Sequence, residues 1–378
     1  MNAAASKSGS GVAERRETAA DRPGVAQPVP IRPVPDRPWS RILMGTLVLL
    51  ALLVGGWEAY WRAFGAHTGT VNNSFGLWAQ ERRRIDAGEG DATVLLGASR
   101  LYFDLQLPVW ERLAGRRPVQ LSIEGTSPLA ALEELAADPA FHGRVIIGVA
   151  PNVFFTGRQF RGGAERYARQ ESPSQRIGQW LSMRFVEPAL AFYDFDFALQ
   201  QVLARQPWPA RDGGPWRRPV RKLAEFDDSR NAHLWDKVET DPGYQEIAKS
   251  IWRQEWTPGP DDPTPAEVQK ASDRQIERAA RVVAAFRARG IAVAFVRPPS
   301  DGEFLDYENR RYPRAQTWDA LLARTGAPGI YFADYPEFAA LRPVEWSHLS
   351  RADAERFTES LYRIISRDVW PAAAPGAR

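Results

Sequence analysis

The chain has 378 residues, of which 44% are hydrophobic and 25% charged, the balance of a globular protein rather than of a disordered or fibrous one. It contains no cysteine, which excludes disulfides, thiolate nucleophiles and cysteine-based zinc sites, and its four histidines are scattered, so we predict no metal site. A net charge of +3 gives no argument for a nucleic-acid partner and we predict none, although the basic pI of about 9.2 keeps that class open.

The first 62 residues predict a tail and a membrane anchor. Residues 1–40 are rich in Ala, Ser, Pro, Gly and Arg and lack an apolar period, which predicts a disordered cytoplasmic tail. Residues 41–62 form an almost unbroken apolar run, long enough to cross a bilayer about 30 Å thick. The run begins too far along the chain for a typical signal peptide, so we predict a retained anchor; the alternative is a buried core helix.

The charges around this run predict its orientation. Seven Lys or Arg residues lie at or before position 41, and none lies between Arg62 and Arg82. The positive-inside rule therefore places the amino terminus in the cytoplasm and the body of the protein outside it. In a Gram-negative host, this describes a single-pass protein of the inner membrane with a periplasmic body.

Strands and helices are predicted to alternate through the rest of the chain. Residues 63–90 are predicted to be a juxtamembrane linker with a short basic helix at 78–85. From 91 to 370, apolar and amphipathic runs predict strands at 93–96, 119–123, 145–150, 291–296 and 329–333, and helices at 107–113, 128–137, 265–289, 317–324 and 351–365. This pattern is typical of an α/β fold, a parallel sheet with helices on both faces.

One long stretch interrupts the alternation. Residues 154–263 are polar, helical in patches and hold six tryptophans, so we interpret them as a helical insertion that decorates the active edge of the sheet. In it, Trp216 is flanked by basic residues, Arg211, Arg217, Arg218, Arg221 and Lys222. These predict a groove for an acidic glycan, with guanidinium groups on its carboxylates. The alternative is a solvated basic face. Residues 371–378 are predicted to be a disordered tail.

A serine and a histidine are predicted to meet at the sheet. Ser99 follows the first strand after the small residues Gly97 and Ala98, and His348 precedes the last helix. The carboxyl ends of parallel strands share one edge, where ligands bind, so the two side chains are expected to converge there. A serine hydroxyl becomes a nucleophile when such a base takes its proton. The alternatives are a turn or capping serine and a partly buried surface histidine.

Further residues at the same edge fit the remaining roles. Glu345 lies three residues before His348 and is predicted to orient its imidazole, with Asp334 as the rival acid. Oxyanion donors are expected from the backbone of Ser99 and Gly125 and from the Asn152 amide, which are otherwise turn residues. Two arginines that lie beside the predicted strand ends are expected to bind substrate, namely Arg100 and Arg297; the alternative for the Arg297 loop is a plain turn.

These motifs resemble those of the SGNH (GDSL-like) hydrolases over residues 91–155 and 290–367. The similar segments are Gly97-Ala98-Ser99-Arg100 for the first block, Gly125 for the second, Asn152 for the third and Glu345-Trp346-Ser347-His348 for the final Asp-x-x-His block. The chain differs from the family pattern in having Ala98 for an acidic residue, Glu345 for aspartate, and no Gly-x-Asn-Asp around Asn152. The resemblance is closest to membrane-anchored SGNH-like proteins linked to acetylation of bacterial exopolysaccharides and cell-wall polymers.

The resemblance implies a flavodoxin-like sheet and Ser–His catalysis without a cofactor. It also implies an anchored extracytoplasmic ester hydrolase or O-acetyltransferase that acts on a carbohydrate polymer, with partners in membrane O-acetylation or export. Whether water or a sugar hydroxyl accepts the acyl group stays open at this point. One alternative is a catalytically inactive SGNH-fold glycan-binding or assembly subunit of an exopolysaccharide export system. Another is a lipase or thioesterase, which needs an apolar acyl channel.

Overall fold

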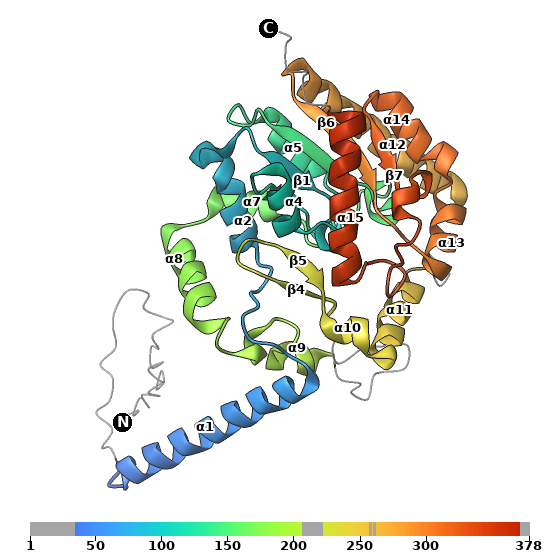
Figure 1. The fold of residues 1–378 in the computed structure, drawn as a ribbon. Coiled ribbons are helices and arrows are strands. Elements are labelled where there is room, and N and C mark those ends of the chain that lie inside the picture. Colours follow the sequence, from blue (N-terminus) through green and yellow to red (C-terminus); the bar gives the residue numbers. More distant parts are fainter. Residues whose placement is uncertain (1–34, 206–221, 257–258, 260–261, 371–378) are drawn as a thin grey trace, which may run out of the picture. The chain divides into compact units, whose positions relative to one another are not determined.

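The computed structural model describes residues 35–205, 222–256, 259 and 262–370 (Figure 1). The chain forms two compact units, residues 1–54 and 55–378. Helix α1 (Trp39–Phe64) contains the predicted anchor, and it is the one helix among the described residues that is long and apolar enough to cross a membrane. Its apolar stretch is not buried, unlike that of a core helix.

The second unit is built around a five-stranded parallel sheet. Its strands are β1 (Thr93–Leu96), β2 (Val119–Gln120), β3 (Arg144–Gly148), β6 (Ala292–Arg297) and β7 (Gly329–Tyr331), in the order β2-β1-β3-β6-β7. The register pairs Leu96 with Ile147 and Gly148 with Val296. Counted along the chain this is the order 2-1-3-4-5 of doubly wound sheets, in which the direction of winding reverses between β1 and β3 and leaves a crevice at their carboxyl ends.

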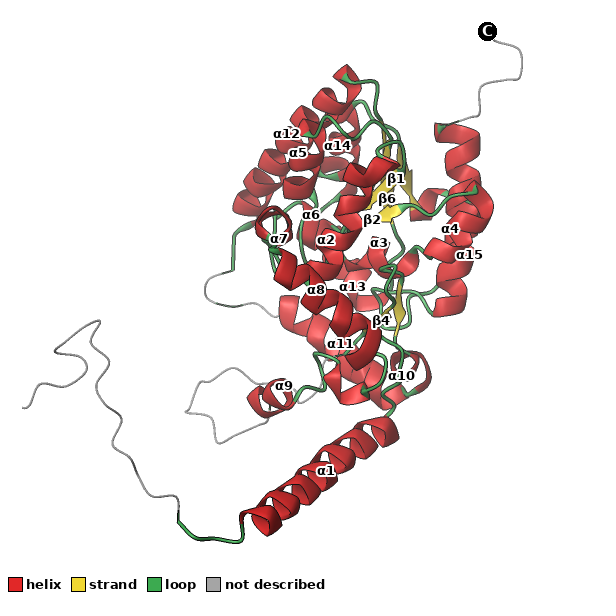
Figure 2. Cartoon of the chain, turned by 90° about the vertical axis from the view of Figure 1, so that its left-hand side faces the viewer, coloured by secondary structure: helices red, strands yellow, loops and turns green. Residues whose placement is uncertain are grey.

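Helices cover both faces of the sheet (Figure 2). Successive strand residues point to opposite faces, so Val94 and Val145 contact one layer while Leu95 and Ile146 contact the other. The first layer contains α2 (Phe75–Arg84), α5 (Leu129–Ala137), α12 (Pro265–Ala288) and α14 (Trp318–Thr325), and the second contains α4 (Leu107–Ala114) and α15 (Arg351–Ile364). The predicted parallel α/β sheet with helices on both faces is confirmed.

The ends of two elements show how local chemistry sets their length. Helix α12 begins at the predicted cap, because Thr264 and Glu267 form a reciprocal capping box, and Gly290 follows its end with a φ of +73°. Strand β2 was predicted to reach residue 123 but ends at Gln120. The N–H groups of Leu121 and Ile123 still bond the Leu95 and Gly97 carbonyls, but the carbonyl of Leu121 accepts a hydrogen bond from Trp78 Nε1 at 3.0 Å.

The insertion is mostly helical, as predicted, but it also contains a β-hairpin that was not. Its elements are α7 (Ala164–Gln170), α8 (Pro173–Leu181), α9 (Leu199–Ala204), α10 (Asp236–Thr240), α11 (Pro242–Trp256) and the hairpin strands β4 (Ala224–Phe226) and β5 (Ala232–Leu234). Three further helices were not predicted, α3 (Ser99–Asp104), α6 (Pro151–Phe154) and α13 (Gly302–Arg311). Short 3-10 or π turns occupy Ile85–Glu89, Ser182–Val186, Ala191–Tyr193, Arg314–Gln316, Phe332–Asp334, Pro336–Phe338 and Ile365–Val369.

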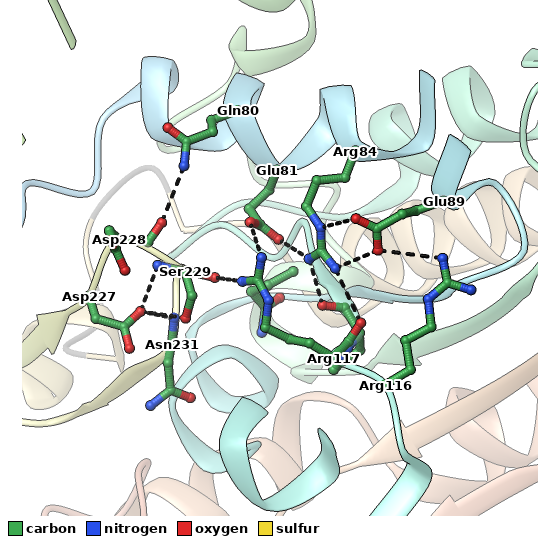
Figure 3. A network of polar contacts seen from close by, with 12 residues as sticks. Gln80, Glu81, Arg84, Glu89, Arg116, Arg117, Asp227, Asp228, Ser229 and Asn231 are labelled. Atoms are coloured by element: carbon green, nitrogen blue, oxygen red, sulfur yellow. Dashed lines mark hydrogen bonds and ion pairs between the residues drawn. The ribbon is translucent and has the colours of Figure 1, made fainter. Parts of the chain in front are cut away.

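A polar network joins α2 to the tip of this hairpin (Figure 3). Arg117, just after α4, donates to the Ser229 carbonyl at 2.7 Å and to Glu81 of α2 at 3.1 Å. Glu81 also accepts from Arg84 at 2.7 Å. Because Glu81 is buried, these two guanidinium groups supply the charge compensation that its carboxylate needs. The network therefore fixes part of the insertion to the sheet-bearing body.

Candidate active site

Ser99 lies where the loop after β1 meets the loop after β3. A side chain at Gly97 would come within 3.2 Å of the Gly148 Cα, which is tighter than an ordinary contact, so glycine at this position favours the close approach of the two strand ends. Ala98 packs against Ala150 and Val153, which follow β3. Ser99 is then the first residue of α3 rather than part of an isolated turn. The predicted position at the carboxyl edge of the sheet is therefore found, although the local structure is a helix start.

The loop that carries His348 is held by the helix that begins at Ser99. His348 is fully buried, and its ring centroid lies 4.7 Å from that of Phe103 in α3. Asp104, the last residue of α3, accepts a hydrogen bond from Leu349 N at 2.9 Å. The His348 carbonyl accepts from Val344 N at 2.8 Å, which closes the loop on itself. Helix α3 thus positions both members of the expected pair: it begins at Ser99, and its Phe103 and Asp104 contact the loop that carries His348.

Ser99, His348 and Glu345 form a continuous hydrogen-bonded relay. Ser99 Oγ lies 2.8 Å from His348 Nε2, across 249 positions of sequence, and His348 Nδ1 bonds Glu345 Oε1. A carboxylate only accepts, so Nδ1 is the donor and Nε2 is left to accept the Ser99 hydroxyl proton. The rival acid Asp334 instead binds the Arg314 guanidinium at 2.6 and 2.7 Å. Of the two candidate acids, the structure brings Glu345 to His348.

Trp252 is a site residue that the sequence did not single out. It lies on α11 of the insertion, and its Nε1 donates to Glu345 Oε2 at 2.5 Å. The same oxygen accepts from Ser347 N at 3.2 Å. The indole ring stacks on Phe304 of α13 at a centroid distance of 5.7 Å and an angle of 12°. The buried acid therefore has donors on both oxygens, and one of them comes from outside the motif-bearing segments.

The backbone between the acid and the base adopts an unusual conformation. Trp346 has a φ of +76°, a left-handed value that costs a bulky residue about 1–3 kcal/mol. Its carbonyl accepts from Asp301 N at 3.0 Å, and Arg253 lies over its ring at 4.7 Å. These contacts from α11 and from the start of α13 hold the strained residue. The chain reversal lets Glu345 and His348, on either side of it, face each other.

The loops that carry the two predicted backbone donors of an oxyanion site lie side by side. Ile123 N donates to the Gly97 carbonyl at 3.0 Å, which places the loop after β2 beside the loop of Ser99. Gly125 has a φ of +59° and lies under Phe160. Within the described residues, neither the Ser99 N–H nor the Gly125 N–H donates a hydrogen bond. Both remain available to a developing negative charge.

Asn152 lies at a cavity beside these loops. It belongs to α6, and Val153 of the same helix and its N-cap Ala150 pack on Ala98, next to Ser99. The cavity has a volume of about 530 Å³ and is lined by Asn152, Thr156, Arg158, Ile251, Gln254, Tyr307 and Tyr312. Six of these seven side chains carry a hydrogen-bonding group, and Ile251 and the two tyrosine rings add apolar surface. The cavity therefore suits a ligand with both polar and apolar faces, such as a sugar ring, better than a plain acyl chain.

The two arginines predicted to bind substrate are buried inside the protein. Arg100 Nη2 lies 2.8 Å from Glu308 Oε1, and Arg297 Nη2 lies 2.6 Å from Glu308 Oε2. Burial raises the pKa of Glu308, but the two guanidinium groups outweigh it and hold the pKa below its ordinary value. Arg100 Nε also donates to Ser347 Oγ at 3.1 Å. We therefore correct the predicted role to a structural one: Arg100 joins Glu308 to the histidine loop through Ser347, and Arg297 holds Glu308 and the loop after β6 through Ser300. Trp216 lies outside the described residues.

Asp104 is a second site residue that was not predicted. It is fully buried, and its Oδ2 has no hydrogen-bond partner among the described residues. Burial raises its pKa well above the ordinary value, and the nearby carboxylate of Glu345 adds to this effect. Asp104 thus supports the histidine loop through a buried carboxyl whose charged form is disfavoured by its surroundings.

Neither protein-family models nor curated proteins match this chain.

Proposed function

We propose that this protein is a membrane-anchored serine esterase or O-acyltransferase of the SGNH-like kind, acting on acyl groups of a carbohydrate polymer outside the cytoplasm. The observation that carries the proposal is the relay from the half-buried Ser99 to the buried His348 and Glu345, with a 2.8 Å contact between the hydroxyl and the imidazole. This distance lies within the range that general-base proton transfer requires.

The chemistry follows from the positions of these atoms. His348 Nε2 takes the Ser99 proton while Oγ attacks the acyl carbonyl, and the N–H groups of Ser99 and Gly125 stabilise the oxyanion. We assign the Asn152 amide as a third donor. The imidazolium, stabilised by Glu345, then protonates the departing alcohol oxygen and leaves the acyl group on Ser99. Water or a sugar hydroxyl, deprotonated by the same imidazole, attacks this ester and restores the serine.

The polar cavity beside Asn152 supports a carbohydrate rather than a lipid. Sugar hydroxyls match the amide, hydroxyl and guanidinium groups that line it, whereas a lipase needs a continuous apolar channel. The polymer itself is the part of the proposal that we take from the family resemblance.

A fluorophosphonate probe tests the nucleophile. We expect the full-length protein in detergent to be labelled and to hydrolyse p-nitrophenyl acetate, and Ser99→Ala to show neither property. Absence of labelling in the folded wild type would contradict the enzyme proposal and favour the non-catalytic glycan-binding subunit. Adding an acceptor oligosaccharide then separates the two enzymes, because a transferase gives an acylated sugar and an esterase releases only the free acid.

The proposed orientation rests on the basic residues that precede α1. Alkaline phosphatase fused after His67 should be active in bacteria, because that enzyme folds only outside the cytoplasm. An inactive fusion, together with an active cytoplasmic reporter at the same position, would reverse the topology.

A further inference from the structure

Exposed apolar side chains gather on one part of the insertion. Outside α1, eight of the nine large apolar side chains that are exposed in the described chain lie between residues 177 and 203. They are between 42% and 62% exposed, and we call them the apolar insertion surface: Ile177, Trp180, Leu181, Phe185, Tyr193, Phe195, Leu199 and Leu203. A soluble body rarely concentrates its exposed apolar groups in this way unless something covers them.

Helix α8 supplies one half of this surface. It is a well-formed helix with a capping box at Ser172, yet none of its residues is buried. Ile177, Trp180 and Leu181 have the i, i+3, i+4 spacing of a single helix face. Phe185 continues that face one turn later, and its ring lies 5.9 Å from that of Trp180. The helix is therefore amphipathic, and its apolar face has no partner within the described chain.

The other half of the surface is fixed to the last turns of α1. Within the unit formed by residues 55–378, Glu58 accepts hydrogen bonds from Ala191 N at 3.0 Å and Phe192 N at 3.1 Å. Trp61 stacks on Phe197 at a centroid distance of 4.8 Å. The segment that joins α8 to α9 is thus tied to the end of the helix that is long enough to cross a membrane.

The linker after α1 forms hydrogen bonds with the same segment between α8 and α9. Asn72 N donates to Glu187 Oε2 at 2.7 Å, and its side chain bonds the Tyr193 carbonyl at 3.1 Å and Phe195 N at 2.8 Å. The backbone is therefore satisfied inside the protein, while the Tyr193 and Phe195 rings remain exposed. The Tyr193 and Phe195 rings thus face outward from a backbone segment that hydrogen bonds hold in place.

We propose that the apolar insertion surface lies in the interfacial layer of the same bilayer that α1 crosses, as a second contact between the body and the membrane. The inference rests on the membrane-anchor part of the proposed function. Ile177, Trp180, Leu181 and Phe185 on one face of α8 and of the turn that continues it, with the exposed Arg184 beside them, are the composition of a helix that lies in a lipid interface. Tyr193 and Phe195 add aromatic rings from the next segment. Continuity with the end of α1 favours lipid over a separate protein partner.

A second membrane contact would fix the orientation of the proposed active site relative to the bilayer. A body held by one helix alone can turn about its linker, whereas two contacts fix the height and orientation of the insertion above the lipid. Because α11 of the same insertion bonds Glu345, the acyl-transfer site is linked through the protein to a surface held at the membrane. The substrate would then be met close to the bilayer.

The absence of cysteine from the chain makes a direct test available. We would reconstitute the full-length protein in nanodiscs of phosphatidylethanolamine and phosphatidylglycerol, with a nitroxide at Phe185→Cys or Leu199→Cys. Glu355→Cys, on the exposed side of α15, is the aqueous control, and Leu50→Cys in α1 is the lipid reference. Power saturation measures collisions of each label with oxygen, which partitions into lipid, and with a nickel chelate, which stays in water.

We expect the oxygen-to-nickel ratio at 185 and 199 to lie above that at 355 and below that at 50. Equal ratios at 185, 199 and 355, with a lipid value at 50, would overturn the second contact and leave the anchor intact. An aqueous value at 50 would instead overturn the anchor, and this proposal with it. Spin–spin broadening at 185 without lipid exposure would show that a second copy covers the surface, which also overturns the proposal. None of these outcomes depends on esterase activity.

Discussion

The sheet-bearing body and the insertion contribute to the candidate site in different ways. The body supplies Ser99, Glu345 and His348 from strand ends and loops that are braced on both sides by a large apolar core. The insertion supplies Trp252 from a helix, and its own apolar cluster around Trp235 and Tyr244 is much smaller. The body therefore positions the reacting atoms, and the insertion stabilises the position of the acid through the Trp252 hydrogen bond.

The largest expected effect is loss of the Ser–His pair in the body. Ser99→Ala and His348→Ala should each lower kcat by roughly 10⁶-fold, the scale seen when a triad nucleophile or base is removed. His142→Ala and His233→Ala are matched controls, since neither ring contacts the relay: His142 bonds Ala140 and His233 bonds Arg351. Ester hydrolysis measures the effect, and full activity of His348→Ala would remove the proposed mechanism.

The acid should matter less than the nucleophile. Glu345→Gln keeps the size of the side chain but removes the charge that stabilises the imidazolium, and we expect a loss of roughly 10⁴-fold in kcat. Asp334→Asn serves as the control, because Asp334 pairs with Arg314 away from the imidazole. The same assay decides between them: if Asp334→Asn lost the rate while Glu345→Gln kept it, our choice of carboxylate would be wrong.

Trp252→Phe tests the contribution of the insertion. The variant keeps the ring stack on Phe304 but deletes the donor to Glu345. A hydrogen bond to a charged group contributes roughly 1.5–3 kcal/mol, so we expect kcat to fall about 10- to 100-fold with KM unchanged. Trp256 on the same helix also stacks on Phe304. The Trp256→Phe variant is therefore the control for ring packing.

Steady-state kinetics and thermal melts of both tryptophan variants separate positioning from stability. If kcat and the melting temperature fell equally in Trp252→Phe and Trp256→Phe, Trp252 would be a packing residue, and the proposed role of the insertion in positioning Glu345 would be wrong.

The smallest expected effect concerns stability rather than rate. Burial raises the pKa of Asp104 in the folded protein above its unfolded value of about 3.9, so the folded state retains this proton to higher pH. The stability that this proton supports is complete below about pH 4 and is lost as pH rises toward the folded pKa. Asp104→Asn keeps an acceptor for Leu349 N without a charge, so its stability should fall less over that range.

Thermal melts between about pH 4 and pH 8 measure this difference, with the exposed Glu355→Gln as control. If the melting temperatures of the wild type and of Asp104→Asn changed in parallel with pH, ionisation of Asp104 would not destabilise the folded protein, and the prediction would be wrong.

Sequence alone determined the layout of the body. Alternating apolar runs predicted its five strands and most of its helices, because the periods of buried strands and amphipathic helices are local properties of the chain. It also determined where Ser99, Gly125 and His348 fall relative to the strands, since parallel strands share one carboxyl edge. The carboxyl end of β2 was misplaced and α3 was not predicted, because they depend on a hydrogen bond from Trp78 and on packing against the histidine loop.

Only the tertiary structure decided how the site is held. Whether an arginine faces a ligand or a buried carboxylate depends on a residue more than 200 positions away, as for Arg100 and Glu308. The bond from Trp252 to Glu345 spans 93 positions and joins an insertion without strand–helix periodicity to a motif loop. No local pattern encodes such pairs, because they form only when separately folded elements pack together and a buried charge must find its partners.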